Sequence, residues 1–257
     1  MKSVKLITLG LLFAMFTGCN KEEKEPPALR LVSRIEIYQS SSGSIESDQT
    51  LEYRYDEQNR IKEIITADEY GSPIRVIYTY TAENIMVANS YTSNTYTLNN
   101  NGFITSLYED DRLLGTMMYS SGYLQKTEFY MELFSMPVTI SETLTWENGN
   151  IKTSTTVTSF SADPPLVISV TTNYEYSSLQ NKPSSMDFGR SYTGVPSGWY
   201  GKSTMNLPMK TTLKREDGSE DVTTCRYETD ADGYPIKIFV QGNGYNEELR
   251  TVIEYED

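Results

Sequence analysis

The chain of 257 residues contains no histidine and only two cysteines. Without an imidazole it cannot form a Ser-His-Asp triad, a Cys-His pair or a histidine zinc site. Catalysis would have to come from carboxylates, tyrosine, lysine or a hard metal ion. Because the chain has 35 acidic residues, the sequence singles out no catalytic pair. We therefore predict a non-enzymatic protein with no catalytic residue, no metal and no cofactor.

Basic residues are also scarce, and this limits the partners. The chain has 22 lysines and arginines against 35 acids, which gives a formal net charge of -13. A surface this acidic repels phosphate backbones, so we predict that the protein does not bind nucleic acid.

Long apolar runs are missing except near the start. Lys2 and Lys5 precede an apolar run over residues 6–16, which is typical of an export signal and too short to span a bilayer. The run ends at Phe16-Thr17-Gly18-Cys19, which resembles the lipobox of lipoprotein precursors, with phenylalanine where leucine is usual. The resemblance implies that residues 1–18 are a signal peptide, that cleavage follows Gly18, and that Cys19 carries a lipid anchor to the membrane. The alternative is an ordinary secreted protein with a chance cysteine.

Residues 19–30 are predicted to be a flexible tether, because a charged, proline-containing segment cannot bury enough surface to fold. The order Cys19-Asn20-Lys21-Glu22-Glu23 resembles the surface-export signal of Bacteroidetes lipoproteins. It implies an outer-membrane protein exposed at the cell surface. The alternative is a generic acidic linker on the periplasmic face.

A strand–turn–strand pattern recurs along the rest of the chain. In Leu51-Glu52-Tyr53-Arg54-Tyr55 side chains alternate between two faces, and β-branched and aromatic residues fit a half-buried pleated surface. Turns such as Asn148-Gly149 supply the positive φ of tight hairpins. We therefore predict that residues 31–257 form a single all-β domain, a long antiparallel β-meander curved into a sheet or partly closed barrel. In the further units the first strand ends at Tyr80, Leu98, Tyr119, Trp146 and Tyr227. Another such first strand ends at Tyr255.

The segment 181–208 breaks this rhythm with glycine and proline. Ser184 could cap a short helix near 183–190, covering an end or an open edge of the sheet. Trp199 and Tyr200 lie here among turn residues, and loops often carry function. They are the candidate ligand-binding residues, although strand aromatics in general belong to the core. The lone Cys225 is predicted to be a small residue on a strand.

Two further resemblances concern the fold. Tyr53-Arg54-Tyr55-Asp56 with Asn59-Arg60-Ile61 is similar to the YD repeat of Rhs-type proteins. The lipobox, the Tyr-x-Tyr hairpins and the run Tyr200-Gly201-Lys202 to Pro208 together resemble a Bacteroidales lipoprotein family of unknown function with a porin-like fold. That resemblance implies a large curved antiparallel sheet approaching a barrel and no particular activity. Charged residues on both strand faces favour a domain outside the bilayer over a membrane barrel.

The leading functional hypothesis is a non-enzymatic binding module for glycans or another nutrient at the cell surface. The first alternative is an accessory subunit that docks on another outer-membrane protein, which an exposed apolar patch would favour. The second alternative is a carboxylate-dependent glycosidase, which would need two acids about 5–9 Å apart, one with a raised pKa.

Overall fold

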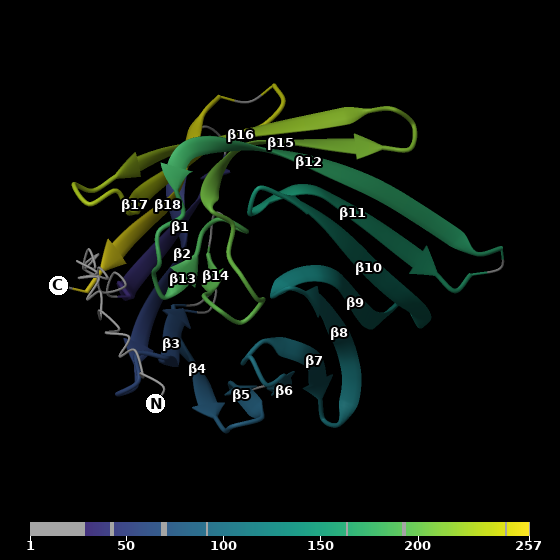
Figure 1. Cartoon of the computed structure of the whole chain (residues 1–257), viewed down its shortest axis with the longest axis horizontal. Helices are drawn as coiled ribbons and strands as arrows, with labels where there is room; N and C mark the ends of the chain where they lie inside the picture. Colours follow the sequence, from purple (N-terminus) through teal and green to yellow (C-terminus); the bar gives the residue numbers. More distant parts are fainter. Residues whose placement is uncertain are drawn as a thin grey trace, which may run out of the picture.

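The structure is a computed structural model that describes residues 29–41, 44–67, 71–90, 92–162, 164–191, 194–244 and 246–256. The predicted signal peptide, Cys19 and most of the tether lie outside these residues. Sixteen strands form a closed antiparallel barrel (Figure 1). They are β1 (Val32–Ser41), β2 (Ser44–Tyr55), β3 (Ile61–Ala67), β4 (Pro73–Tyr80), β5 (Asn84–Ala88), β6 (Ser93–Leu98), β7 (Ile104–Glu109), β8 (Arg112–Ser120), β9 (Tyr123–Leu133), β10 (Met136–Glu147), β11 (Asn150–Phe160), β12 (Leu166–Gln180), β15 (Asn206–Arg215), β16 (Glu220–Thr229), β17 (Pro235–Gln241) and β18 (Glu248–Tyr255).

The all-β meander is confirmed, and the curved sheet closes completely. Strands adjacent in sequence pair with one another around the ring, with β12 passing directly to β15. The ring closes where β1 pairs with β18, with Ile35 opposite Ile253. Closure removes the two edges that an open sheet would leave unpaired.

The two faces of the wall differ in polarity, as the alternation predicts. Ile35 and Tyr53 face inward and are 0% and 6% exposed. Arg54, Glu63 and Arg75 face outward from β2, β3 and β4, and Glu63 forms ion pairs with both arginines at 3.1 and 2.6 Å. At these strands the barrel wall is apolar inside and charged outside.

A repeated hydrogen bond explains why most of the sequence units have a first strand that ends in an aromatic residue. An aromatic side chain at the end of one strand donates a hydrogen bond to a backbone carbonyl at the start of the neighbouring strand. Because the two strands are antiparallel, both groups lie at the same end of the barrel. The donor–acceptor pairs are Tyr55–Val32, Tyr80–Ile61, Tyr119–Ile104, Trp146–Leu124, Tyr227–Pro208 and Tyr255–Pro235, at 2.6 to 3.0 Å. These six bonds link neighbouring strands at the rim of the barrel.

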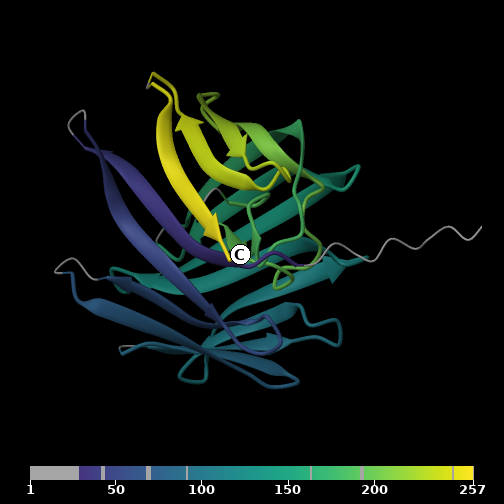
Figure 2. The ribbon, with the colours of Figure 1, turned by 90° about the vertical axis from the view of Figure 1, so that its left-hand side faces the viewer.

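The irregular segment fills this end of the barrel from inside. We call it the plug, residues 181–191 and 194–205, and it includes the short strands β13 (Met186–Asp187) and β14 (Val195–Pro196). Figures 1 and 2 both show its green trace within the ring of strands. Met186 and Phe188 are 3% and 2% exposed and pack in one core cluster with Ile35 and Tyr53. The prediction that this segment covers an end of the sheet is confirmed.

The prediction of a short helix near 183–190 is wrong, because the backbone of this segment bonds to the barrel. The Ser185 N–H donates to the Arg30 carbonyl at 2.8 Å, and the Ser185 Oγ accepts from the Val32 N–H. Ser184 Oγ donates to the Met186 carbonyl, so it caps no helix. Over the described ranges no helix is long and apolar enough to cross a membrane.

Candidate functional site at the plugged end

The plug is attached to successive turns of the rim by its backbone. The plug residues that form these hydrogen bonds are three positions apart in sequence, and each bonds to a different hairpin of the rim. The plug therefore runs across the strands and contacts one hairpin after another. The bonds run from Ile104 N to Trp199 O (2.9 Å), from Lys202 N to Gly122 O (2.8 Å) and from Met205 N to Gly149 O (3.0 Å).

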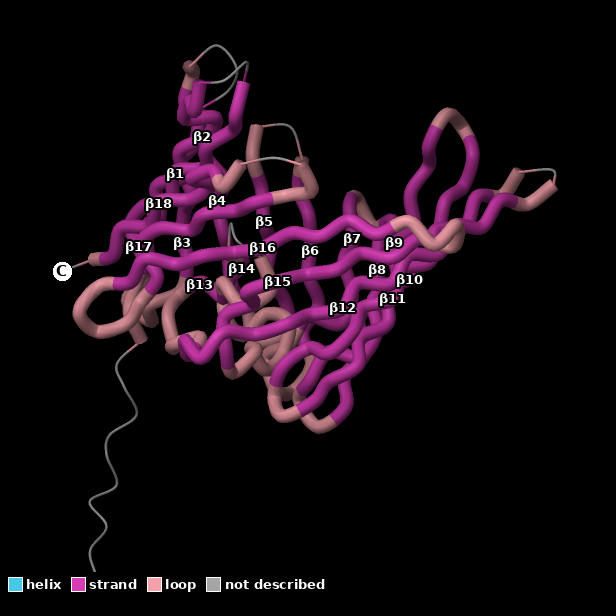
Figure 3. Tube along the Cα trace, turned by 90° about the horizontal axis from the view of Figure 1, so that it is seen from above, coloured by secondary structure: helices cyan, strands magenta, loops and turns pink. Residues whose placement is uncertain are grey.

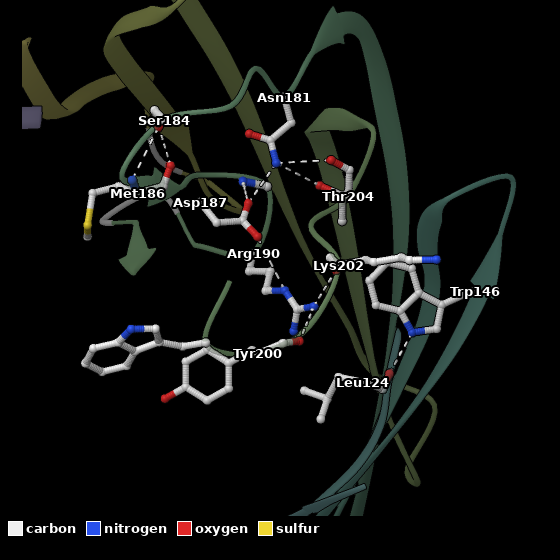
Figure 4. A network of polar contacts seen from close by, with 12 residues as sticks. Leu124, Trp146, Asn181, Ser184, Met186, Asp187, Arg190, Tyr200, Lys202 and Thr204 are labelled. Atoms are coloured by element: carbon white, nitrogen blue, oxygen red, sulfur yellow. Dashed lines mark hydrogen bonds and ion pairs between the residues drawn. The ribbon is translucent and has the colours of Figure 1, made fainter. Parts of the chain in front are cut away.

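A buried ion pair holds the plug in its folded shape (Figure 4). The Asp187 carboxylate is 4% exposed, accepts from Asn181 Nδ2 at 2.7 Å and lies 3.5 Å from Arg190 Nε. Arg190 Nη2 donates to the carbonyls of Tyr200 and Lys202, both at 2.8 Å. Burial lowers the pKa of the Arg190 guanidinium, and the Asp187 charge opposes that shift. These contacts satisfy both buried charges, so we assign them a structural role.

Both predicted binding residues pack against the core cluster around Ile104, and only one of them also lines a described cavity. Trp199 is half-buried, with its ring 5.7 Å from the rings of both Tyr78 and Tyr96, and it lines a cavity. Tyr200 packs against the core cluster around Ile104, and burial raises the pKa of its hydroxyl to about 12. Only Trp199 is placed to touch a ligand in that cavity, and its binding role stays a prediction.

The cavity beside Trp199 lies between the plug and the wall and measures about 190 Å³. Pro196 and Ser197 line it from the plug. A larger and more open depression of about 480 Å³ lies over the first rim turn. The two are neighbours that share the lining residues Gln58, Arg60 and Tyr80, and we call the pair the rim cavity. Its other lining residues include Tyr55, Asp56, Glu57, Lys62, Tyr78 and Thr79.

Arg60 is the central polar group of the rim cavity. Its guanidinium lies 4.3 Å from the Tyr80 ring centre and 2.7 Å from the Asp56 carboxylate. Burial acts to raise the pKa of Asp56, but hydrogen bonds from Arg60 and the Gln58 N–H outweigh it and lower that pKa. Sequence reasoning missed these residues because residues 56–59 match an ordinary turn. Their only signal was the YD-like match of this unit, which is better than that of the others.

The turn at Asp230 and the lone Cys225 do not form a metal-binding or catalytic site. Asp230 accepts hydrogen bonds from the N–H groups of Asp232 and Tyr234 and pairs with Arg30, as expected for a hairpin turn. Within the described ranges no group of three His, Cys, Asp or Glu side chains could hold a metal ion. Cys225 lies on β16, and burial raises the pKa of its thiol to about 11. Such a thiol is a poor nucleophile at neutral pH.

Comparison with known proteins identifies the fold. No family model matches the sequence, and no curated protein matches it. The structure is similar to a porin-like protein from Bacteroides vulgatus, with a TM-score of 0.54 and 14% identity, over 88% of this chain and 99% of that one. It is also similar to a porin-like protein from Bacteroides uniformis, with a TM-score of 0.51 and 16% identity, over 88% of this chain and 96% of that one. The chain therefore has a porin-like barrel fold.

Proposed function

We propose that this protein is a lipid-anchored, non-enzymatic binding module of the outer membrane, exposed at the cell surface and selective for glycans. The lipobox-like sequence ending at Cys19 supports the anchor, and the porin-like fold supports the outer-membrane setting. The rim cavity is the observation that supports a glycan as the ligand. Its smaller part is lined by the ring of Trp199 and by the polar side chains of Gln58 and Arg60.

The chemistry of the rim cavity suits a sugar ring. Aromatic faces pack against the C–H face of a pyranose, and a few fixed polar groups orient its hydroxyls. The Gln58 amide offers both a donor and an acceptor, and Arg60 offers donors only. The Asp56–Arg60 pair holds the guanidinium in place before a ligand arrives, which lowers the entropy lost on binding.

We place the barrel wall outside the bilayer although its fold is porin-like. A wall in lipid carries an apolar outer band, and a Lys or Arg at the bilayer midplane costs about 2–4 kcal/mol. Here charged pairs are spread around the exterior. They include Arg54–Glu63, Lys126–Glu128, Lys210–Glu175 and Arg226–Glu247. Such a wall is suited to water, and a lipid on Cys19 would supply the attachment.

Thermal unfolding of the protein with a panel of host, plant and microbial glycans tests the ligand class. A glycan at about 100 times its dissociation constant should stabilise the fold by about 2.7 kcal/mol. Arg60→Ala and Trp199→Phe should abolish the shift. Arg226→Ala is the matched control, because Arg226 also stacks on a ring, that of Phe239 at 3.8 Å, and pairs with an acid, but lies outside the rim cavity. A shift that survives Arg60→Ala would rule out this cavity.

The glycosidase alternative gains no support from the carboxyl groups. A general acid needs a raised pKa. Among the described residues, the carboxyl pKa values that depart from the ordinary range all move down, because hydrogen bonds that favour the charged form outweigh burial. They belong to Asp56, Glu63, Glu128, Asp217, Glu228, Asp230 and Glu247.

The accessory-subunit alternative is favoured by one observation. Apolar side chains are exposed at the far ends of β9 to β12, with Phe134 86% and Val167 52% exposed. A patch of this kind marks an interaction surface.

A further inference from the structure

The far ends of four strands extend beyond their neighbours in the wall. We call this region the flap, residues 130–140 and 157–162 with 164–169. β8 pairs with β9 only as far as Phe129, and β15 pairs with β12 only from Val170. The β11–β12 hairpin reaches farthest from the barrel in Figures 1 and 3. On the side away from β11, residues Leu166 to Ser169 have no strand partner in the described chain, so this stretch is a free edge, as is the part of β9 beyond Phe129.

This free edge is apolar on both of its faces. Leu166, Val167 and Ile168 are 51%, 52% and 45% exposed. Proteins usually protect a free edge with lysine, proline or a bulge, because its unpaired N–H and C=O groups recruit further strands. Pro164 and Pro165 precede the edge, and the three aliphatic residues that follow have no such protection. Three consecutive exposed apolar residues indicate a surface that is covered when the protein functions.

The flap carries few charges. The chain has 22 basic and 35 acidic residues, but within the flap only Glu132 is charged. With a net charge of -13, two copies repel each other over most of their surfaces. They can approach flap to flap with almost no contact between like charges.

We propose that the free edge of β12 pairs antiparallel with the same edge of a second copy. An edge that meets its own copy about a twofold axis is self-complementary. Centred on Val167, the pairing sets Val167 opposite Val167 and Leu166 opposite Ile168, and it joins the two flaps into one continuous sheet. A lipid surface fits this edge less well, because hydrocarbon offers no partner to unpaired backbone groups.

Cysteine cross-linking of the full-length lipidated protein in detergent tests the pairing. In an antiparallel pair opposed Cα atoms lie about 4.5 or 5.5 Å apart, which a disulfide can bridge. Val167→Cys in a Cys225→Ser background should give a disulfide-linked dimer under mild oxidation. Met118→Cys is the control, since Met118 is 60% exposed on the outer wall of β8, and it should stay monomeric. Equal cross-linking of the two variants would overturn the proposal.

Sedimentation of the unmodified chain gives the second readout. The wild type should reach twice the monomer mass with rising concentration, and Val167→Lys should remain monomeric, with the wild-type unfolding midpoint at concentrations where both are monomers. The midpoint should hold because the Val167 side chain is 52% exposed and contributes little to the fold. A dimer that persists in Val167→Lys would overturn the proposal. A wild type that stays monomeric would also overturn it, whether or not the edge captures another protein or lipid vesicles.

Discussion

The Tyr119 hydroxyl donates a hydrogen bond to the Ile104 carbonyl at 2.7 Å and lies 3.5 Å from the Trp199 carbonyl. Ile104 opens β7 and is 0% exposed, and its N–H donates to the same Trp199 carbonyl. One tyrosine therefore joins the end of β8 to the start of β7 at the point where the plug touches the wall. The barrel rim and the plug should accordingly lose stability together.

Removal of this hydroxyl should destabilise the protein measurably. Tyr119→Phe deletes one buried hydrogen bond, and we expect a loss of about 1–1.5 kcal/mol in the free energy of unfolding. Tyr130→Phe is the control, because its hydroxyl bonds only to Glu128 on the outer face, at 3.3 Å. Urea denaturation of both variants gives the comparison. Equal losses would show that the contact with Ile104 contributes nothing of its own.

Gly201 should tolerate no side chain, because the plug approaches the rim too closely. Its φ is +81°, and an added Cβ would lie 2.5 Å from the Gly122 carbonyl oxygen. Gly218 has a φ of +82° with open space around it. Alanine at either position incurs the left-handed backbone penalty, about 1–2 kcal/mol. Gly201→Ala should therefore lower the unfolding midpoint more than Gly218→Ala, and similar shifts in thermal melts would contradict the close approach.

The β9–β10 turn should be improved by a residue that accepts positive φ. Phe134 and Ser135 have φ of 51° and 62°, a geometry that favours Asn-Gly and is costly for a bulky side chain. Phe134→Asn should stabilise the fold by about 1 kcal/mol. The reciprocal change, Asn148→Phe at the two-residue turn of β10–β11, should destabilise it. Calorimetry of the two variants checks the signs, and a destabilising Phe134→Asn would refute this account.

Buried tyrosines should make the protein sensitive to alkali. Burial raises their pKa above the unfolded value of 10, so above pH 10 the unfolded chain loses protons that the folded chain keeps. Stability is then complete below pH 10 and falls as pH rises toward 12, by up to about 1.4 kcal/mol per pH unit for each such tyrosine. The pKa values of Tyr55, Tyr78, Tyr174 and Tyr200 are about 12.

Tyrosinate absorbance and circular dichroism, followed together from pH 9 to 12, check this prediction. We expect most tyrosines to ionise in one cooperative step that coincides with the loss of β structure. Gradual ionisation near pH 10 without unfolding would show that these hydroxyls are exposed to solvent.

The strands and turns could be predicted from sequence because their causes are local. Alternation in Leu51 to Tyr55 sets which side chains face inward, and the positive φ of Asn148 and Gly149 is a property of the turn alone. The helix near 183–190 was a local prediction as well. It failed because Arg30 and Val32, about 150 residues earlier in the chain, bond to Ser185.

The sequence by itself therefore determined the β-meander, its hairpin turns and an aromatic residue at the end of most units. Only the tertiary structure decided that the sheet closes, since pairing of β1 with β18 depends on the curvature summed over all the strands. It also decided the rim cavity, which is lined both by Trp199 and by Arg60 from a turn far away in sequence. Contacts of this kind depend on how the plug docks in the barrel, and no short stretch of sequence encodes that geometry.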